Sequence, residues 1–447
     1  MSTAFDLITV IITVLLLVKN IKKITLSSRY LIYVLFLFYY VAPLILDMVF
    51  MRPEYTKLLH RGFELTRDDE LTRCLYDVFT IYAQIVILYI RKRGTLSWYI
   101  KPINNASLED KLKYKRDNVY VLVFVGAVLP IFLAVILPVN KAVLYTFQWR
   151  EYDVIDYNKY FGFIEKFTYM GTICTMLLLT RALNKRDIGL TVFCGITLFM
   201  NLCIQGKRSI LFFALLVYIL IMFLGLQDKS LDQKSRRRKI IGLLFVVITV
   251  VVIMIGMTLV VKVTSRGYEA SDKSQLYTAL RIDFFRDDRV RLAMYHVLHP
   301  SEMKIIDWPG QSLLPFPTWL FPIDYILGKL GVSYPAYTTY FSSAVLMLPR
   351  SQSFTNMTPC IYAELVSNFG LFGALAMPFL CVWFAIKADK YPYPFNVFII
   401  VSFIVLQMYA ISYMAYYFEF VFFMCWFLKS DVKFVVGNLR RAGRDSA

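Results

Sequence analysis

The feature that most constrains this chain is a series of apolar stretches, each roughly 17 to 25 residues long, that recurs from end to end. A helix of that length crosses the hydrocarbon layer of a bilayer, and the short connections leave no room for an independent soluble core. Hydrophobic residues make up 58% and charged residues 18% of the chain, which is too apolar for a surface that faces water. We therefore predict an all-α, polytopic membrane protein and exclude soluble enzymes and DNA-binding proteins.

The hydropathy pattern predicts about eleven transmembrane helices, within a range of ten to twelve. The first stretch is short, the ninth is long, and the last two are separated only by length and charge. The first has no basic segment before it, so we interpret it as a retained span and not as a signal peptide. The predicted spans are 3–18, 30–50, 72–90, 118–138, 162–180, 188–205, 209–226, 240–263, 357–386, 395–411 and 412–428.

Charge is distributed unequally between the connections. One alternating set carries 28 Lys or Arg against 9 Asp or Glu, whereas the other set carries 19 against 16. Cytoplasmic connections are enriched in Lys and Arg, so the first set is predicted to be cytoplasmic and the second external. This topology places the N-terminus outside and the C-terminus inside. It also accounts for the net charge of +18 without a nucleic-acid partner.

The predicted organisation has four parts: an N-terminal bundle of about eight helices (1–263), a large external loop (264–356), C-terminal helices (357–428) and a basic cytoplasmic tail (429–447). The external loop is far longer than a connection needs to be. Its first part, 272–299, lacks Pro and Gly and predicts one or two helices. Its second part interleaves prolines with Trp and Tyr, which predicts an irregular aromatic surface that either seats the loop on the membrane interface or stacks on sugars.

Cysteine and histidine give no sign of a metal centre. The seven cysteines fall in or beside spans without a CxxC pair, and the three histidines lack metal-site spacing. We expect neither a metal nor a cofactor.

Two adjacent cations, Lys207 and Arg208, stand in an external connection, where the inside-positive bias argues against them. Gly206 permits a tight turn, and a helix that begins at Ser209 would direct free N–H groups to the same place, an arrangement suited to a phosphate or diphosphate. The alternative is a pair that reaches toward lipid phosphates.

A second charged cluster runs from Arg281 to Arg291 and includes Asp283, Arg286 and Asp287. On a helix, Arg281 and Asp288 lie on one face, so the run either pairs with itself at a solvated surface or contributes to a site.

Glu364 lies inside the ninth apolar stretch, near its external end. A carboxylate buried in a membrane has to pair or take up a proton, so Glu364 is a candidate site residue.

These places resemble the bacterial oligosaccharide repeat unit polymerases, the Wzy-type polymerases of O-antigen and capsule. The resemblance lies in the Gly-x-Arg turn at Gly206 to Arg208, the Arg-x-Asp-Phe-x-Arg-Asp run from Arg281 to Asp287, and a Pro/Trp-rich segment at 315–335 with shifted spacing. A further similarity joins Pro359, Glu364, the Asn368-Phe369-Gly370 triplet and Gly373.

The resemblance implies a GT-C-like polymerase or ligase architecture in the bacterial inner membrane, with the site facing the periplasm. The enzyme would polymerise undecaprenyl-diphosphate-linked oligosaccharide repeat units, and a chain-length regulator and a flippase are further possible partners. The candidate catalytic residues, which would accept a proton from a sugar hydroxyl, are Glu364, Asp283 and His296. The candidate residues for binding diphosphate or glycan are Lys207, Arg208, Arg266, Arg281, Arg286, Asp287, Trp319 and Asn368.

Two other functions fit the same pattern. A transporter or flippase of lipid-linked glycan would line a path with its intramembrane charges, although the odd span count and the large loop argue against it. The related O-antigen ligase would need the same arginine-rich site, and the sequence separates it poorly from a polymerase.

Overall fold

The computed structural model describes residues 2–21, 28–51, 61–90, 106–137, 159–185, 187–205, 214, 277–278, 281, 285–313, 330, 337–349, 359–390 and 395–408. Within these ranges the chain is helical and contains no β-strand. The all-α prediction is therefore confirmed for the part of the chain that is described.

Three helical segments are long and apolar enough to cross a membrane: Ser28–Val49, Glu70–Tyr89 and Leu371–Asp389. Shorter apolar helical segments cover Tyr120–Ile136, Ile188–Asn201 and Val397–Met408. These helices indicate a membrane protein. The count of eleven spans remains a prediction, and the predicted spans 209–226, 240–263 and 412–428 lie outside the described residues, apart from Ala214.

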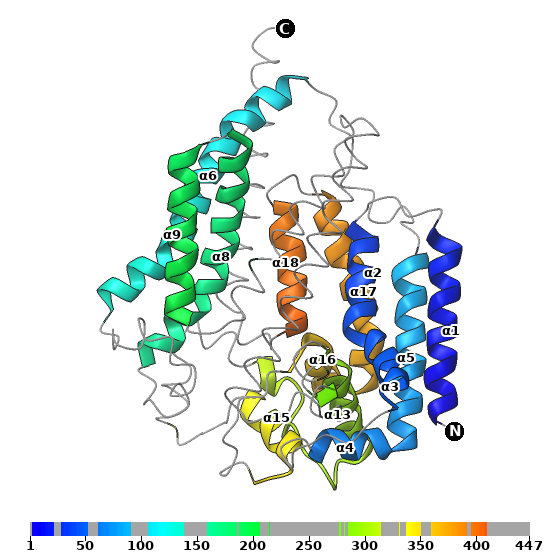
Figure 1. Ribbon diagram of the computed structural model, residues 1–447. Coiled ribbons are helices and arrows are strands. Elements are labelled where there is room, and N and C mark those ends of the chain that lie inside the picture. Colours follow the sequence, from blue (N-terminus) through cyan, green and yellow to red (C-terminus); the bar gives the residue numbers. More distant parts are fainter. Residues whose placement is uncertain are drawn as a thin grey trace, which may run out of the picture.

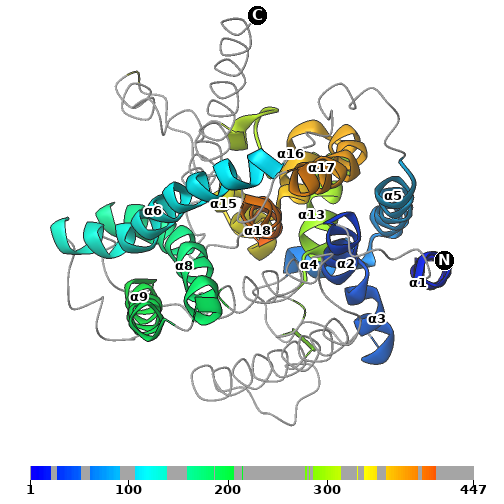
Figure 2. The same cartoon turned by 90° about the horizontal axis from the view of Figure 1, so that it is seen from above.

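Two groups of helices make up the described structure (Figures 1 and 2). In one group α6 (Ala106–Ile136), α8 (Lys159–Lys185) and α9 (Ile188–Gln205) pack on one another. In the other, α5 (Glu70–Tyr89) packs between α1 (Ser2–Ile21) and α17 (Leu371–Lys390), and α17 also contacts α2 (Ser28–Tyr40) and α18 (Phe395–Met408). Asp69 begins α5, because its carboxylate accepts a hydrogen bond from the Thr72 backbone N–H at 2.8 Å.

The second predicted span bends near Val41, where α2 ends and α3 (Ala42–Val49) begins. Pro43 lies in the first turn of α3 and has no N–H to donate to the preceding turn. The bend allows the Pro43 carbonyl to accept a hydrogen bond from Arg281, 238 residues further along the chain.

The ninth predicted span, 357–386, consists of two helices, α16 (Ile361–Phe369) and α17. Gly370 separates the two helices, and its backbone has a φ of +60°, a conformation that residues with a Cβ rarely adopt. Gly373 permits the close approach that follows, because a Cβ there would lie 2.0 Å from the Leu365 carbonyl oxygen. The break turns α16 away from α17 and places it among the helices of the large loop.

The described elements of the large loop gather at one end of the apolar helices (Figure 1, bottom). They are α13 (Asp287–Leu298), a short 3₁₀ turn (Gln311–Leu313) and α15 (Tyr337–Leu346). α13 packs on α16, α5 and α4 (Arg61–Asp68), and α15 packs on α4. Asp287 and Asp288 lie in the first turn of α13, where carboxylates favour the helix N-terminus, and Pro300 follows its last turn.

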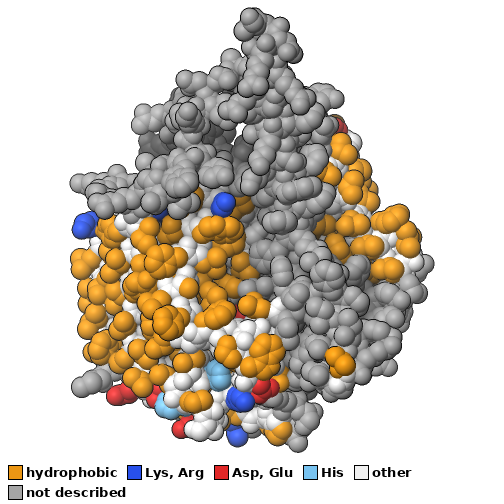
Figure 3. All heavy atoms as spheres, turned by 180° about the vertical axis from the view of Figure 1, so that it is seen from behind, with side chains coloured by type: hydrophobic (Ala, Val, Ile, Leu, Met, Phe, Trp, Pro, Cys, Tyr) orange, Lys and Arg blue, Asp and Glu red, His pale blue; other side chains and the backbone are white. Residues whose placement is uncertain are grey.

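A band of hydrophobic side chains covers the back of the α1, α5 and α17 group (Figure 3). Acidic, basic and histidine side chains gather at the lower edge of this band, the end at which α13 and α16 lie. This distribution is the one expected where apolar helices leave a membrane and meet water.

Candidate functional site: a buried arginine network beside a cavity

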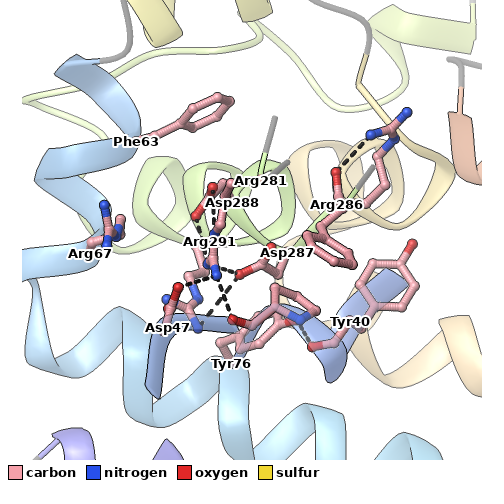
Figure 4. A network of polar contacts seen from close by, with 12 residues as sticks. Tyr40, Asp47, Phe63, Arg67, Tyr76, Arg281, Arg286, Asp287, Asp288 and Arg291 are labelled. Atoms are coloured by element: carbon pink, nitrogen blue, oxygen red, sulfur yellow. Dashed lines mark hydrogen bonds and ion pairs between the residues drawn. The ribbon is translucent and has the colours of Figure 1, made fainter. Parts of the chain in front are cut away.

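A buried arginine lies at the centre of an ionic network that ties the large loop to the membrane helices (Figure 4). Arg281 is 1% exposed and forms ion pairs with Asp47 of α3 and with Asp287 and Asp288 of α13. Both contacts with Asp288, from Nε and from Nη2, are 3.2 Å long. Arg281 also donates a hydrogen bond of 2.7 Å to the Pro43 carbonyl. The role of Arg281 in diphosphate binding remains a prediction.

Arg291 extends the ionic network to Asp6 of α1 and to Tyr76 of α5. Its guanidinium lies 4.7 Å from the centroid of the Tyr76 ring, 3.8 Å from Asp287 and 4.0 Å from Asp6. Asp6 accepts a hydrogen bond of 2.5 Å from Arg73 of α5. Because removing one member of a buried ion pair leaves its partner uncompensated, this network holds α13 firmly on the ends of α1, α3 and α5.

The two acidic residues at the start of α13 have different proton affinities. Burial raises the pKa of Asp287 to about 7, because desolvation and the neighbouring carboxylates outweigh the attraction of Arg281. Burial acts on Asp288 in the same direction, but two contacts with the Arg281 guanidinium hold its pKa below the ordinary range. Of these two carboxyl groups, Asp287 is therefore the one that takes up a proton near neutral pH.

Arg286, the residue before α13, connects the loop to two membrane helices. Its backbone N–H donates to the Tyr39 carbonyl of α2 at 3.1 Å, and its Nε donates to the Gln407 carbonyl of α18 at 3.1 Å. The side chain is 5% exposed. Its described contacts position the start of α13, and its predicted contact with substrate remains a prediction.

Next to this network lies a cavity of about 720 Å³ between the C-terminal part of α13, the segment after it and the α16–α17 junction. Lys304 and Asp307 form an ion pair of 3.1 Å at its edge, and Tyr340 of α15 donates a hydrogen bond of 2.5 Å to Asp307. The lining residues are His296, Pro300, Lys304, Ile306, Asp307, Trp308, Pro309, Ser367, Asn368, Phe369, Gly370 and Phe372. The cavity therefore combines an imidazole, an ammonium group and an indole with a hydrophobic floor.

His296 is the candidate base that lines this cavity. Its Nδ1 lies 3.0 Å from the Met303 carbonyl oxygen and 3.3 Å from the Ile305 backbone N–H. The Met303 contact requires a proton on Nδ1, whereas the Ile305 contact requires the Nδ1 lone pair, so the two contacts favour opposite tautomers. In the tautomer with the proton on Nδ1, the Nε2 lone pair is available to accept a proton. Burial lowers the pKa of His296 below its ordinary value of 6.5, so the ring is neutral at pH 7.

Asn368 also lines the cavity, but its side-chain amide forms hydrogen bonds that connect α16 to the turn at Gly310. Its Oδ1 accepts a hydrogen bond of 2.8 Å from the Gly310 N–H, and its Nδ2 donates to Ser312 Oγ at 2.7 Å. Gly310 has a φ of +88°, which favours glycine at this turn. Asn368 thus fixes the turn that carries Trp308, whose side chain is 43% exposed.

Glu364 lies one turn before Asn368 on α16 and is 1% exposed. Its carbonyl accepts a hydrogen bond from Asn368 Nδ2 at 2.7 Å, and its side chain is not among those that line the cavity. The structure thus brings His296 and Asn368 into one cavity and leaves Glu364 behind its wall. The other predicted site residues lie outside the described ranges: Asp283, Lys207, Arg208, Arg266 and Trp319.

Sequence reasoning missed Lys304 and Asp307 as site residues and included Trp308 only among the aromatic residues of the large loop. The Asp307-Trp308-Pro309-Gly310 run has the composition of a tight turn, which could have marked Trp308 as a side chain held on a fixed turn. Among the described residues, no group of three or more His, Cys, Asp and Glu side chains is placed to share a metal ion.

In comparisons with known proteins, no family model, no curated protein and no solved structure matches this chain.

Proposed function

We propose that this protein is a membrane glycosyltransferase that polymerises undecaprenyl-diphosphate-linked oligosaccharide repeat units at the outer face of the bacterial inner membrane. The observation that supports this most strongly is the cavity at the end of the apolar helices, where the neutral imidazole of His296 faces a space lined by Lys304 and Trp308. A sugar hydroxyl, a phosphate and a sugar ring are the groups that these side chains suit.

In the proposed reaction, a hydroxyl of the acceptor sugar attacks the anomeric carbon of the donor glycan. His296 Nε2 takes the hydroxyl proton as the new glycosidic bond forms. The bond between the anomeric carbon and the diphosphate breaks, and its electron pair leaves with the lipid diphosphate. Cations beside the departing oxygen stabilise the developing negative charge.

The proposal ranks His296 above the other two candidate bases. Glu364 supports the wall through its carbonyl, and its side chain does not line the cavity. Asp283 lies outside the described residues and keeps its place as a candidate base.

Lys304 adds a cation that the sequence did not single out. Its side chain is 55% exposed and pairs with Asp307 at the cavity edge, so its ammonium group is accessible to a phosphate that enters the cavity. Lys207, Arg208, Arg266, Arg281 and Arg286 remain proposed diphosphate ligands. Arg208→Lys keeps the charge but loses the planar fork that contacts two phosphate oxygens, so we expect both Arg208→Lys and Arg208→Ala to shorten the polymer.

Exchanging the candidate bases tests the proposal. We expect His296→Gln to lower the rate of glycan transfer on the order of 10²-fold or more, and Glu364→Gln to have a smaller effect. The matched control is His299→Gln, which removes an imidazole three residues away that lies 3.5 Å from Asp69. The readout is the polymer ladder from cells with equal amounts of each protein.

The pH profile separates a base from a structural histidine. If His296 accepts the proton, the rate of glycan transfer by the wild-type protein falls on the acid side with a midpoint below pH 6.5, the ordinary pKa of imidazole.

A wild-type ladder from His296→Gln would refute the role of His296 as base. A normal ladder from Arg208→Ala would refute the diphosphate assignment at that turn.

A further inference from the structure

The helix α17 presents one exposed apolar stripe that starts in the cavity. Phe372, Leu375, Phe379 and Trp383 follow one another at spacings of three, four and four residues, so they lie along a single face of the helix. The residues on the opposite face, such as Ala374, Met377 and Cys381, are fully buried. In the view from above, α17 lies at the edge of its group of helices, with α2 and α18 on its inner side (Figure 2).

The stripe is continuous with the cavity because they share a residue. Phe372 lines the cavity, yet its side chain is 80% exposed. Phe379 and Trp383, about two and three turns further on, are 51% and 49% exposed. A ligand whose polar head occupies the cavity therefore finds an apolar track that leads directly away from it into the bilayer.

The stripe also differs in chemistry from the exposed face of α1. Three of its four members are aromatic, whereas α1 exposes mainly aliphatic residues such as Leu7, Ile11 and Leu15. Flat aromatic faces offer large contact areas at low cost in side-chain entropy, which suits a long chain that must be held in one place. At the far end, the Lys387 ammonium lies 5.7 Å from the Trp383 ring centroid and closes the stripe with a charge.

We infer that the stripe of Phe372, Leu375, Phe379 and Trp383 binds the polyisoprenoid chain of a lipid-linked substrate whose diphosphate and sugar enter the adjoining cavity. The inference rests on the proposed function for the chemistry of the head group. It rests on the geometry of α17 for the position of the chain. Substrate thus enters sideways from the membrane along α17.

A photocrosslinking experiment tests the position of the chain. A benzophenone side chain replaces Phe379 in one variant and Phe199 of α9 in the control, and the probe is undecaprenyl diphosphate in phosphatidylcholine nanodiscs. The two positions are matched in exposure, because Phe379 is 51% and Phe199 is 56% exposed. They are also matched in depth: Phe379 lies about 12 Å along α17 from Leu371, and Phe199 lies about 9 Å along α9 from Gln205, the helix ends that are predicted to face outward. We expect on the order of tenfold more adduct at position 379, since the probe gains apolar contact there.

Competition by unlabelled lipids distinguishes a specific binding site from ordinary contact with bilayer lipid. Excess undecaprenyl monophosphate should reduce the adduct at position 379, whereas an equal amount of dioleoyl phosphatidic acid should not. Equal adduct at both positions, or equal competition by both lipids, would show ordinary bilayer contact and overturn the inference.

Glycan transfer, measured on the same variants, separates this inference from the proposed function. Specific adduct without any glycan transfer by the wild-type protein would refute the polymerase and leave the lipid site standing. Glycan transfer by the wild-type protein without preferential adduct at position 379 would refute the lipid site and leave the proposed polymerase standing. Phe372→Ala combined with Phe379→Ala should raise the KM for the lipid-linked substrate, and an unchanged KM would also overturn the inference.

Discussion

Asn368 joins the turn that carries Trp308 to the membrane helix α16, and its removal has an effect that can be worked out from the structure. Asn368→Ala eliminates two hydrogen bonds between helix and turn, those with Gly310 N–H at 2.8 Å and Ser312 Oγ at 2.7 Å. At about 1 kcal/mol each, the turn should lose ~2 kcal/mol of local stability. Because local opening governs amide exchange, this corresponds to roughly 30-fold faster exchange.

Hydrogen–deuterium exchange of the peptide that covers residues 308–313 measures this effect, with the α13 peptide 288–298 as the internal reference. Ser312→Ala removes only the Oγ partner of Nδ2 and keeps the bond with Gly310, so it should speed exchange by about half as much on a logarithmic scale. Exchange at wild-type rates in Asn368→Ala would refute the view that this amide holds the turn.

Three further predictions concern the network and the packing around it. Arg281→Met should destabilise the protein by about 3–5 kcal/mol in thermal unfolding, because three carboxylates lose their common partner, whereas Lys304→Met at an exposed pair should cost less than about 1 kcal/mol. Asp287 has its folded-state pKa raised from 3.8 to about 7, so its contribution to stability is full below 3.8 and is lost as pH rises toward 7; the Asp287→Asn variant should lack this decline, and parallel stability curves for the two proteins would contradict it. Gly62→Ala should destabilise the contact of α4 with α15 by about 1–3 kcal/mol, since its Cβ would lie 2.2 Å from the Ala344 carbonyl oxygen, and an unchanged unfolding temperature would refute this.

Much of the fold was predictable because hydropathy is a local property. The segments at 3–18, 30–50, 72–90 and 188–205 correspond closely to α1, to α2 with α3, to α5 and to α9. The break between α16 and α17 was not predicted, because the apolar composition continues through it and only the Gly370 conformation reveals it. Periodicity cannot indicate where a continuous apolar stretch changes direction.

The candidate site was predictable only in part. The pairing of Arg281 with Asp288 followed from spacing along the chain, but its burial did not, because Asp47 and Pro43 join it from more than 230 residues away. His296 and Asn368 were each selected from the sequence, yet nothing in the sequence indicated that they line one cavity. Trp308 was expected only as part of the aromatic surface of the large loop, and Lys304 was recognised as a cavity residue only in the three-dimensional structure.

The central claim is that the cavity beside His296 is where glycan is transferred between lipid-linked units. The most direct measurement places the purified protein in liposomes with the lipid-linked repeat unit from native membranes and no other protein. The account predicts that the wild-type protein produces a ladder of longer lipid-linked glycans, that His299→Gln does the same, and that His296→Gln produces almost none. A wild-type protein that leaves the repeat unit at its original length, or a His296→Gln variant that extends it normally, would contradict the account.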